Sequence, residues 1–268
     1  MKIFCSVLAL CAALLPVAAP AQSPRLGEII DARMRPGWQT ERGTHMAALH
    51  IRLAGDWMTY WRHPGESGIA PQLNVAGSRN LANARIHWPE PRLYFKAGQA
   101  SIGYMRDVIL PIELTPEDPG LPLELDARLL IGVCDDICIP VDLALTLNVH
   151  DTGRPDGMIA TALTRKPRLA RQTGLQTVSC TVTPEDRGMR LSVSLTLPPQ
   201  GHVEFALVEM AGSTVFSRAM RSERTGDTIT GHSLLRLKPG EAIDRSAVRT
   251  SIVSENGVVQ HQGCALSE

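Results

Sequence analysis

The chain has 268 residues, with 27 acidic and 27 basic side chains and a hydrophobic fraction of 44%. This length allows one large domain or two ordinary domains, each with a buried core. The hydrophobic fraction is too high for a disordered chain, and the zero net charge argues against a nucleic-acid-binding protein, which needs a basic surface.

Residues 1–21 show the three-part pattern of a secretory signal peptide. A positively charged start is followed by an apolar stretch that runs to Ala19, and small residues precede Gln22. We expect cleavage after Ala21, because a membrane anchor needs about 20 apolar residues and different flanks. Export would remove Cys5 and Cys11 and leave four cysteines in an exported protein that does not span the membrane.

Short runs of alternating apolar and polar residues, bounded by turn-forming residues, recur along the rest of the chain and are typical of β-sandwiches. We predict strands at 46–53, 107–114, 121–133, 139–149, 191–197 and 203–210. Residues 151–175 are polar and basic instead, with a helical turn or two near Met158–Leu163. We therefore predict an all-β chain of two tandem β-sandwich domains, 22–150 and 176–268, joined by a partly helical linker at 151–175.

Cys134 and Cys138 lie at the tip of a predicted hairpin. Odd positions on both sides of the tip are apolar, so pairing Val133 with Ile139 makes core residues face core residues. This register places Cys134 opposite Cys138, at a distance that suits a disulfide. Both cysteines occupy even positions, so we expect the bond on the face that points away from the core, where a thiolate can reach it.

This pair has two interpretations. It can be a hairpin staple, although a bond that closes so short a loop contributes little stability. It can also be a redox-active bond, because accessible disulfides are the labile ones. Asp135 and Asp136 lie between the cysteines and disfavour a thiolate, so a redox role would be that of a relay pair activated by its partner.

Cys180 and Cys264 form the second predicted disulfide, although four cysteines allow three pairings. Cys180 is in phase with Val178 and Val182, so its side chain is predicted to point inward. Cys264 lies four residues from the end of the chain. A bond between them would join the first strand of the second domain to its last, which indicates a structural role.

Three segments resemble the periplasmic N-terminal region of DsbD/ScsB-type protein-disulfide reductases: Trp57–Gly68, Gly103-Tyr104 and Val133–Pro140. The resemblance implies immunoglobulin-like domains in the periplasm. It also implies that Cys134 and Cys138 carry electrons from a membrane-embedded thiol carrier, of the DsbD transmembrane or CcdA type, to thioredoxin-fold proteins. Residues 176–268 resemble the additional sandwich of ScsB-like members. Because the sequence shows neither a transmembrane carrier nor a thioredoxin domain, we expect a separate membrane partner.

Aromatic residues supply further candidates for the surface around the cysteine pair. Tyr94 and Phe95, in a segment flanked by Pro and Gly, are predicted to shield it, with Tyr60, Trp61 and His63 on the same shielding or partner surface. The alternative for all five is ordinary core and turn packing.

We expect no cofactor and no resident metal, because the eight histidines show no zinc-binding spacing. Cys134 and Cys138 could still supply two thiolates to Cu(I), although no methionine lies in the loop between them. The alternative function is therefore a non-catalytic binding or assembly module, Cu(I)-binding or scaffolding, in which both disulfides are structural.

Overall fold

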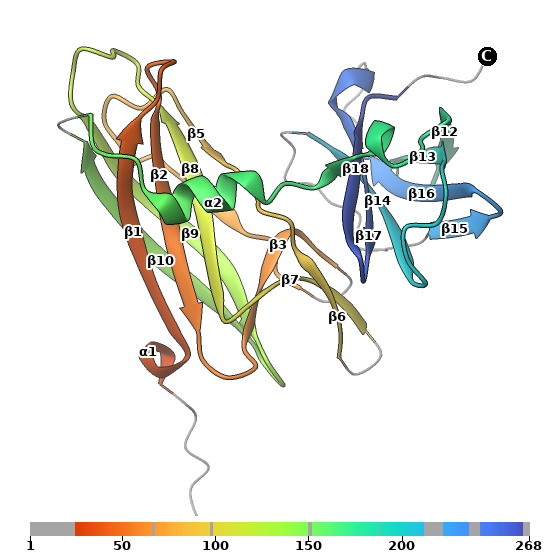
Figure 1. The fold of residues 1–268 in the computed structure, drawn as a ribbon, viewed down its shortest axis with the longest axis horizontal. Coiled ribbons are helices and arrows are strands. Elements are labelled where there is room, and N and C mark those ends of the chain that lie inside the picture. Colours follow the sequence, from red (N-terminus) through yellow and green to blue (C-terminus); the bar gives the residue numbers. More distant parts are fainter. Residues whose placement is uncertain are drawn as a thin grey trace, which may run out of the picture.

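The computed structural model describes residues 25–65, 68–96, 99–149, 152–186, 188–211, 222–235 and 242–264. This part of the chain is all-β, with its strands grouped in four sheets and short helices between them (Figure 1). The predicted signal peptide, its cleavage site after Ala21, Cys5 and Cys11 lie outside the described residues. No described helix is long and apolar enough to cross a membrane.

Two of the sheets form what we call the N-terminal sheet pair, which follows the short helix α1 (Leu26–Ile29). One sheet has the strand order β1 (Ile30–Gln39), β2 (His45–Leu53), β8 (Asp107–Thr115) and β5 (Asn83–Ile86). The other has the order β10 (Cys138–Val149), β9 (Leu123–Cys134), β3 (Met58–Gly65), β7 (Gln99–Met105) and β6 (Arg92–Lys96), with β4 (Gln72–Asn74) also paired to β9. Their shared core buries apolar side chains from both sheets, such as Leu49, Leu110 and Leu129.

The other two sheets form the C-terminal sheet pair. One has the order β11 (Arg168–Leu169), β18 (Gly257–Gln262), β17 (Val248–Ser254) and β14 (Glu204–Met210). The other has the order β12 (Thr177–Glu185), β13 (Gly188–Thr196), β16 (Thr228–Leu235) and β15 (Ser222–Thr225). Two short 3₁₀ helices, η1 (Ala170–Gln172) and η2 (Arg245–Ala247), complete this part.

All six strands that were predicted from the alternation of apolar and polar residues are present, as β2, β8, β9, β10, β13 and β14.

Helix α2 (Gly157–Thr164) forms where a helical turn or two was predicted. Its first turn is capped by Asp156, whose Oδ1 accepts hydrogen bonds from the backbone nitrogens of Met158 and Ile159, at 2.8 and 3.3 Å. Ile159 and Ala162 are buried in a cluster with side chains of β2 and β8. The helix therefore packs against the N-terminal pair, whereas β11 joins the C-terminal sheet by parallel pairing with β18.

Cys180 and Cys264 form a disulfide in the core of the C-terminal pair, as predicted. The two side chains are 1% and 8% exposed, and their Cα atoms lie 5.8 Å apart. The bond links Cys180 of β12 to Cys264, which follows β18. Its burial in an apolar cluster supports a structural interpretation.

The two sheet pairs meet along β3 and β6, on the side of the N-terminal pair that faces β17 in Figure 1. Leu207, Val253 and Val258 of the C-terminal pair belong to the same buried cluster as the N-terminal core. The Arg62 Nε donates to Glu209 Oε1 at 2.9 Å, and burial lowers the pKa of Arg62 while Glu209 opposes that shift. The sheet pairs are therefore joined by apolar contact and by a buried ion pair.

Candidate redox site

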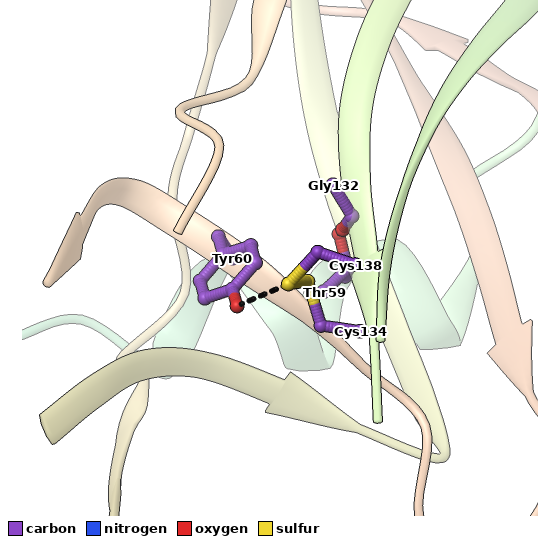
Figure 2. The surroundings of a disulfide bond; sticks show 5 residues. All are labelled: Thr59, Tyr60, Gly132, Cys134 and Cys138. Atoms are coloured by element: carbon purple, nitrogen blue, oxygen red, sulfur yellow. Dashed lines mark hydrogen bonds between the residues drawn. A yellow bond between two sulfur atoms is a disulfide. The ribbon is translucent and has the colours of Figure 1, made fainter. Parts of the chain in front are cut away.

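The Cys134–Cys138 disulfide closes the hairpin of β9 and β10 (Figure 2). The strands pair in the predicted register, with Val133 opposite Ile139 and Cys134 opposite Cys138. The Cα atoms of the two cysteines are 4.1 Å apart, and Asp135, Asp136 and Ile137 form the connecting loop. The alternation of apolar residues in this hairpin was therefore sufficient to predict both the register and the bond.

The two sulfur-bearing side chains differ sharply in exposure, which corrects the expectation that the whole bond lies on an open face. Cys134 is only 3% exposed, whereas Cys138 is exposed at the hairpin tip. The reason is that Cys134 belongs to a second small apolar cluster, on the sheet face opposite the main core. Its other members are Met58, Tyr60, Tyr94 and Met105. An incoming thiolate therefore meets Cys138 first.

Tyr60 lies directly beside the sulfur of Cys138, the exposed cysteine of the pair. Its side chain is 2% exposed, and its hydroxyl oxygen is 3.6 Å from Cys138 Sγ, as Figure 2 shows. A disulfide sulfur carries no proton, so in this state the tyrosine hydroxyl is the donor. This hydroxyl is placed to donate a hydrogen bond to a Cys138 thiolate once that sulfur is released from a mixed disulfide.

Glycines make room for the Tyr60 ring. A Cβ atom on Gly132 of β9 would lie 3.1 Å from the ring, and one on Gly68 would lie 2.5 Å from it. Thr59 fixes the adjacent backbone, because its hydroxyl donates to the carbonyl oxygen of Gly132 at 2.9 Å (Figure 2). The two glycines therefore allow the ring to lie over β9, next to the disulfide.

Tyr94 and Phe95, predicted together as a shield, lie in different surroundings. Tyr94 packs in the cluster of Cys134, and burial raises the pKa of its hydroxyl, which stays protonated. Phe95 is 59% exposed, and its ring centroid lies 6.4 Å from that of Phe205 in the C-terminal pair. Because neighbouring side chains of a strand point to opposite faces, β6 places only Tyr94 beside the cysteines.

Trp61 and His63 do not lie on a surface that a partner could touch, contrary to the prediction. Trp61 is fully buried in the main core, with the Arg62 guanidinium 3.6 Å above its ring. His63 is 2% exposed, and its Nδ1 accepts a hydrogen bond from the backbone nitrogen of Gly65. Strand alternation turns Trp61 to the face opposite Tyr60, and the pairing of β3 with β7 shifts register after Tyr60.

Met58 and Met105 belong to the site although sequence reasoning missed them. Met58 lies directly opposite Cys134 across the β3–β9 pair, and Met105 lies opposite Met58 across the β3–β7 pair. The methionines are distant from the cysteines in the sequence, so only the strand pairing brings them together. Among the described residues, no group of three or more His, Cys, Asp or Glu side chains is arranged to hold a metal ion.

Comparisons with known proteins found a matching family model and a similar solved structure. Residues 31–149 match the family model of the N-terminal region of the thiol:disulfide interchange protein DsbD. The crystal structure of the N-terminal periplasmic domain of ScsB from Proteus mirabilis matches with a TM-score of 0.56 and 21% sequence identity, over 92% of this chain and 96% of that one. At this identity the structural match establishes a shared fold. No curated protein sequence matched the chain.

Proposed function

We propose that the chain is a thiol–disulfide exchange protein that works through Cys134 and Cys138, because residues 31–149 match the family model of the DsbD N-terminal region. The observation that carries this proposal is the asymmetry of the disulfide. One cysteine is exposed at a hairpin tip beside a tyrosine hydroxyl, and the other is buried beneath aromatic and methionine side chains. A bond that served only as a staple would need neither feature.

The proposed reaction begins at the exposed sulfur. A partner thiolate attacks Cys138 Sγ, the Cys134–Cys138 bond breaks, and Cys134 leaves as a thiolate that takes up a proton. A second thiolate of the partner then attacks its own sulfur in the mixed disulfide and releases Cys138. Two electrons and two protons have then reached the cysteine pair, and the partner has gained a disulfide.

The reduced pair passes its electrons on by the reverse sequence. The Cys138 thiolate attacks an oxidised partner's disulfide, and Cys134 then attacks Cys138 Sγ to restore the internal bond. The short hairpin keeps Cys134 opposite Cys138, so the second step is intramolecular and fast. The Tyr60 hydroxyl stabilises the Cys138 thiolate by hydrogen bonding in both directions.

The match to the DsbD N-terminal region supports a proposal for the partners. We propose that a separate membrane-embedded thiol carrier reduces the pair and that thioredoxin-fold proteins of the periplasm accept the electrons. In the same proposal, residues 22–150 and 176–268 are immunoglobulin-like domains joined by the linker 151–175, and the signal peptide directs the chain to the periplasm. The contacts of Arg62 with Glu209 and of Phe95 with Phe205 join the two sheet pairs.

Thiol transfer in solution tests the proposal. The reduced protein is mixed with an oxidised thioredoxin-fold protein, and free thiols on each are counted by alkylation and mass measurement. We expect one disulfide to appear at Cys134–Cys138 for each disulfide lost from the acceptor, while Cys180 and Cys264 stay bonded throughout. If no thiols reach the acceptor, the alternative of a non-catalytic binding or assembly module is favoured.

A further inference from the structure

A groove at the junction of the two sheet pairs is lined by basic side chains. Its volume is about 290 Å³, and we call it the junction groove. The basic residues come from β3, from β5 and the residue after it, from the linker and from β17: Arg62, Arg85, His87, Lys166 and Arg249. Among the described residues that line the groove, none is acidic. The chain after α2 crosses from one sheet pair to the other in Figure 1, so both pairs and the linker contribute to this groove.

Two of the basic side chains, Arg62 and Arg249, share one carboxylate. Arg62 Nε and Arg249 Nη1 lie 2.9 and 3.6 Å from Glu209 Oε1. The Arg62 guanidinium is held further by Trp61, whose ring lies 3.6 Å below it. One carboxylate balances only one of the two guanidinium charges, so a positive charge remains on the C-terminal side of the groove.

The N-terminal side of the groove has the same arrangement. Arg85 Nη2 and His87 Nε2 lie 2.7 and 2.8 Å from Glu113 Oε2, while Arg42 Nη2 lies 2.7 Å from Glu113 Oε1. Burial lowers the pKa of His87, Glu113 opposes this shift, and the charges of Arg85 and Lys166 add to it. His87 is therefore neutral near pH 7, and Lys166 lies close enough for its charge to act on this end of the groove.

Positive charge exceeds negative charge around the junction groove. Four of the lining side chains are cationic, whereas Glu209 and Glu113 supply two negative charges. Glu90 lines a neighbouring cavity, where its Oε1 accepts a hydrogen bond from the backbone nitrogen of Val258 at 2.7 Å. A cleft lined by charges of one sign focuses its field on a ligand of the opposite sign. A ligand with two negative charges would balance the excess.

We propose that the junction groove binds one small dianion, whose oxygen atoms accept hydrogen bonds from Arg85, Lys166 and Arg249. Guanidinium groups match the oxygens of phosphate and of carboxylates, so inorganic phosphate and short dicarboxylates have the required chemistry. Binding pockets usually measure about 300–1,000 Å³, so a groove of about 290 Å³ suits a small ligand. Ile86 and Leu169 add apolar surface, which strengthens the attraction by excluding water.

The bound dianion would contact both sheet pairs and the linker, and so stabilise their junction. The site contains no cysteine, and its occupation is independent of the proposed thiol exchange.

The test is a calorimetric titration of the full oxidised chain with inorganic phosphate or succinate near neutral pH, at an ionic strength held constant with sodium chloride. We expect one dianion per chain and a Tm that rises with the concentration of the ligand. K166Q and R85Q should each weaken binding about tenfold, the scale of a lost hydrogen bond to a charged group. R128Q is the matched control, because Arg128 is an exposed arginine of β9 that pairs with Asp142 and lies outside the groove. All three changes affect exposed side chains, so the variants should fold.

The two ligands also distinguish the source of the anion. Competition between phosphate and succinate supports one site for both, and binding of only one of them supports the site and assigns it to that ligand. Affinities of K166Q and R85Q equal to that of R128Q, or a rise in Tm that sodium chloride reproduces, would overturn the proposal. Binding of an oligoglutamate peptide without binding of phosphate or succinate would overturn it as well, in favour of an acidic protein partner. Reduced and oxidised chains should bind the dianion equally.

Discussion

Replacing Cys134 with alanine is expected to abolish turnover and to accumulate mixed disulfides on Cys138. The variant keeps the exposed thiol beside the Tyr60 hydroxyl and removes the sulfur that would resolve the adduct. Replacing Cys138 with alanine is expected to abolish turnover as well, yet to accumulate little adduct, because the remaining Cys134 is 3% exposed. Non-reducing electrophoresis of the cell extract after acid quenching, followed by mass spectrometry, measures both adducts.

This outcome reverses the expectation from strand parity alone. By strand alternation alone, both cysteines would face solvent. The Cys138→Ala variant would then keep an accessible Cys134, on which the adduct would form. The C180A/C264A variant serves as the control, since it retains the Cys134–Cys138 bond and should show no stable adduct. More adduct on Cys134 in C138A than on Cys138 in C134A would contradict the assignment of Cys138 as the attacking sulfur.

Removing the Cys180–Cys264 bond is expected to lower the free energy of unfolding of the C-terminal sheet pair by about 4 kcal/mol. The bond spans 84 residues, so its loss restores much conformational freedom to the unfolded chain. The C180A/C264A variant also loses buried sulfur atoms from the apolar core, which adds to the effect. Urea unfolding followed by the fluorescence of a probe in this sheet pair measures the change.

The matched comparison is the C134A/C138A variant. Its bond joins residues separated by only 4 positions, so its removal should cost about 2 kcal/mol or less in the same model. Thiol transfer by C180A/C264A should remain, provided that the measurement is made at a temperature where the variant is folded. A larger loss of stability from removing Cys134–Cys138 than from removing Cys180–Cys264 would show that the two roles are assigned the wrong way round.

The hairpin that carries the site was predictable because two strands with the same period of two constrain each other. Only one register lets Val133 and its apolar neighbours face those that follow Cys138, so the pairing and the disulfide followed from the sequence. The burial of Cys134 did not follow. It depends on β3, which lies far earlier in the chain and brings Met58 and Tyr60 over the same face.

The aromatic surface was the least predictable part of the site. Tyr60 and Trp61 are adjacent in the sequence, yet one lies beside the disulfide and the other in the main core. Tyr94 packs beside Cys134, whereas the exposed Phe95 lies against Phe205 of a sheet pair that was predicted as a separate domain. Strand alternation explains both divisions once the strands are known, but the sequence alone does not specify which face of β3 or β6 meets which neighbour.

The reduction potential of the Cys134–Cys138 bond tests the account most directly. It is measured by equilibrating the full chain with glutathione or dithiothreitol buffers and quantifying alkylated cysteines by peptide mass. We expect a potential above about −300 mV for this bond and a lower one for the buried Cys180–Cys264 bond. A Cys134–Cys138 potential below about −300 mV, equal to that of the structural bond, would contradict a role in thiol–disulfide exchange.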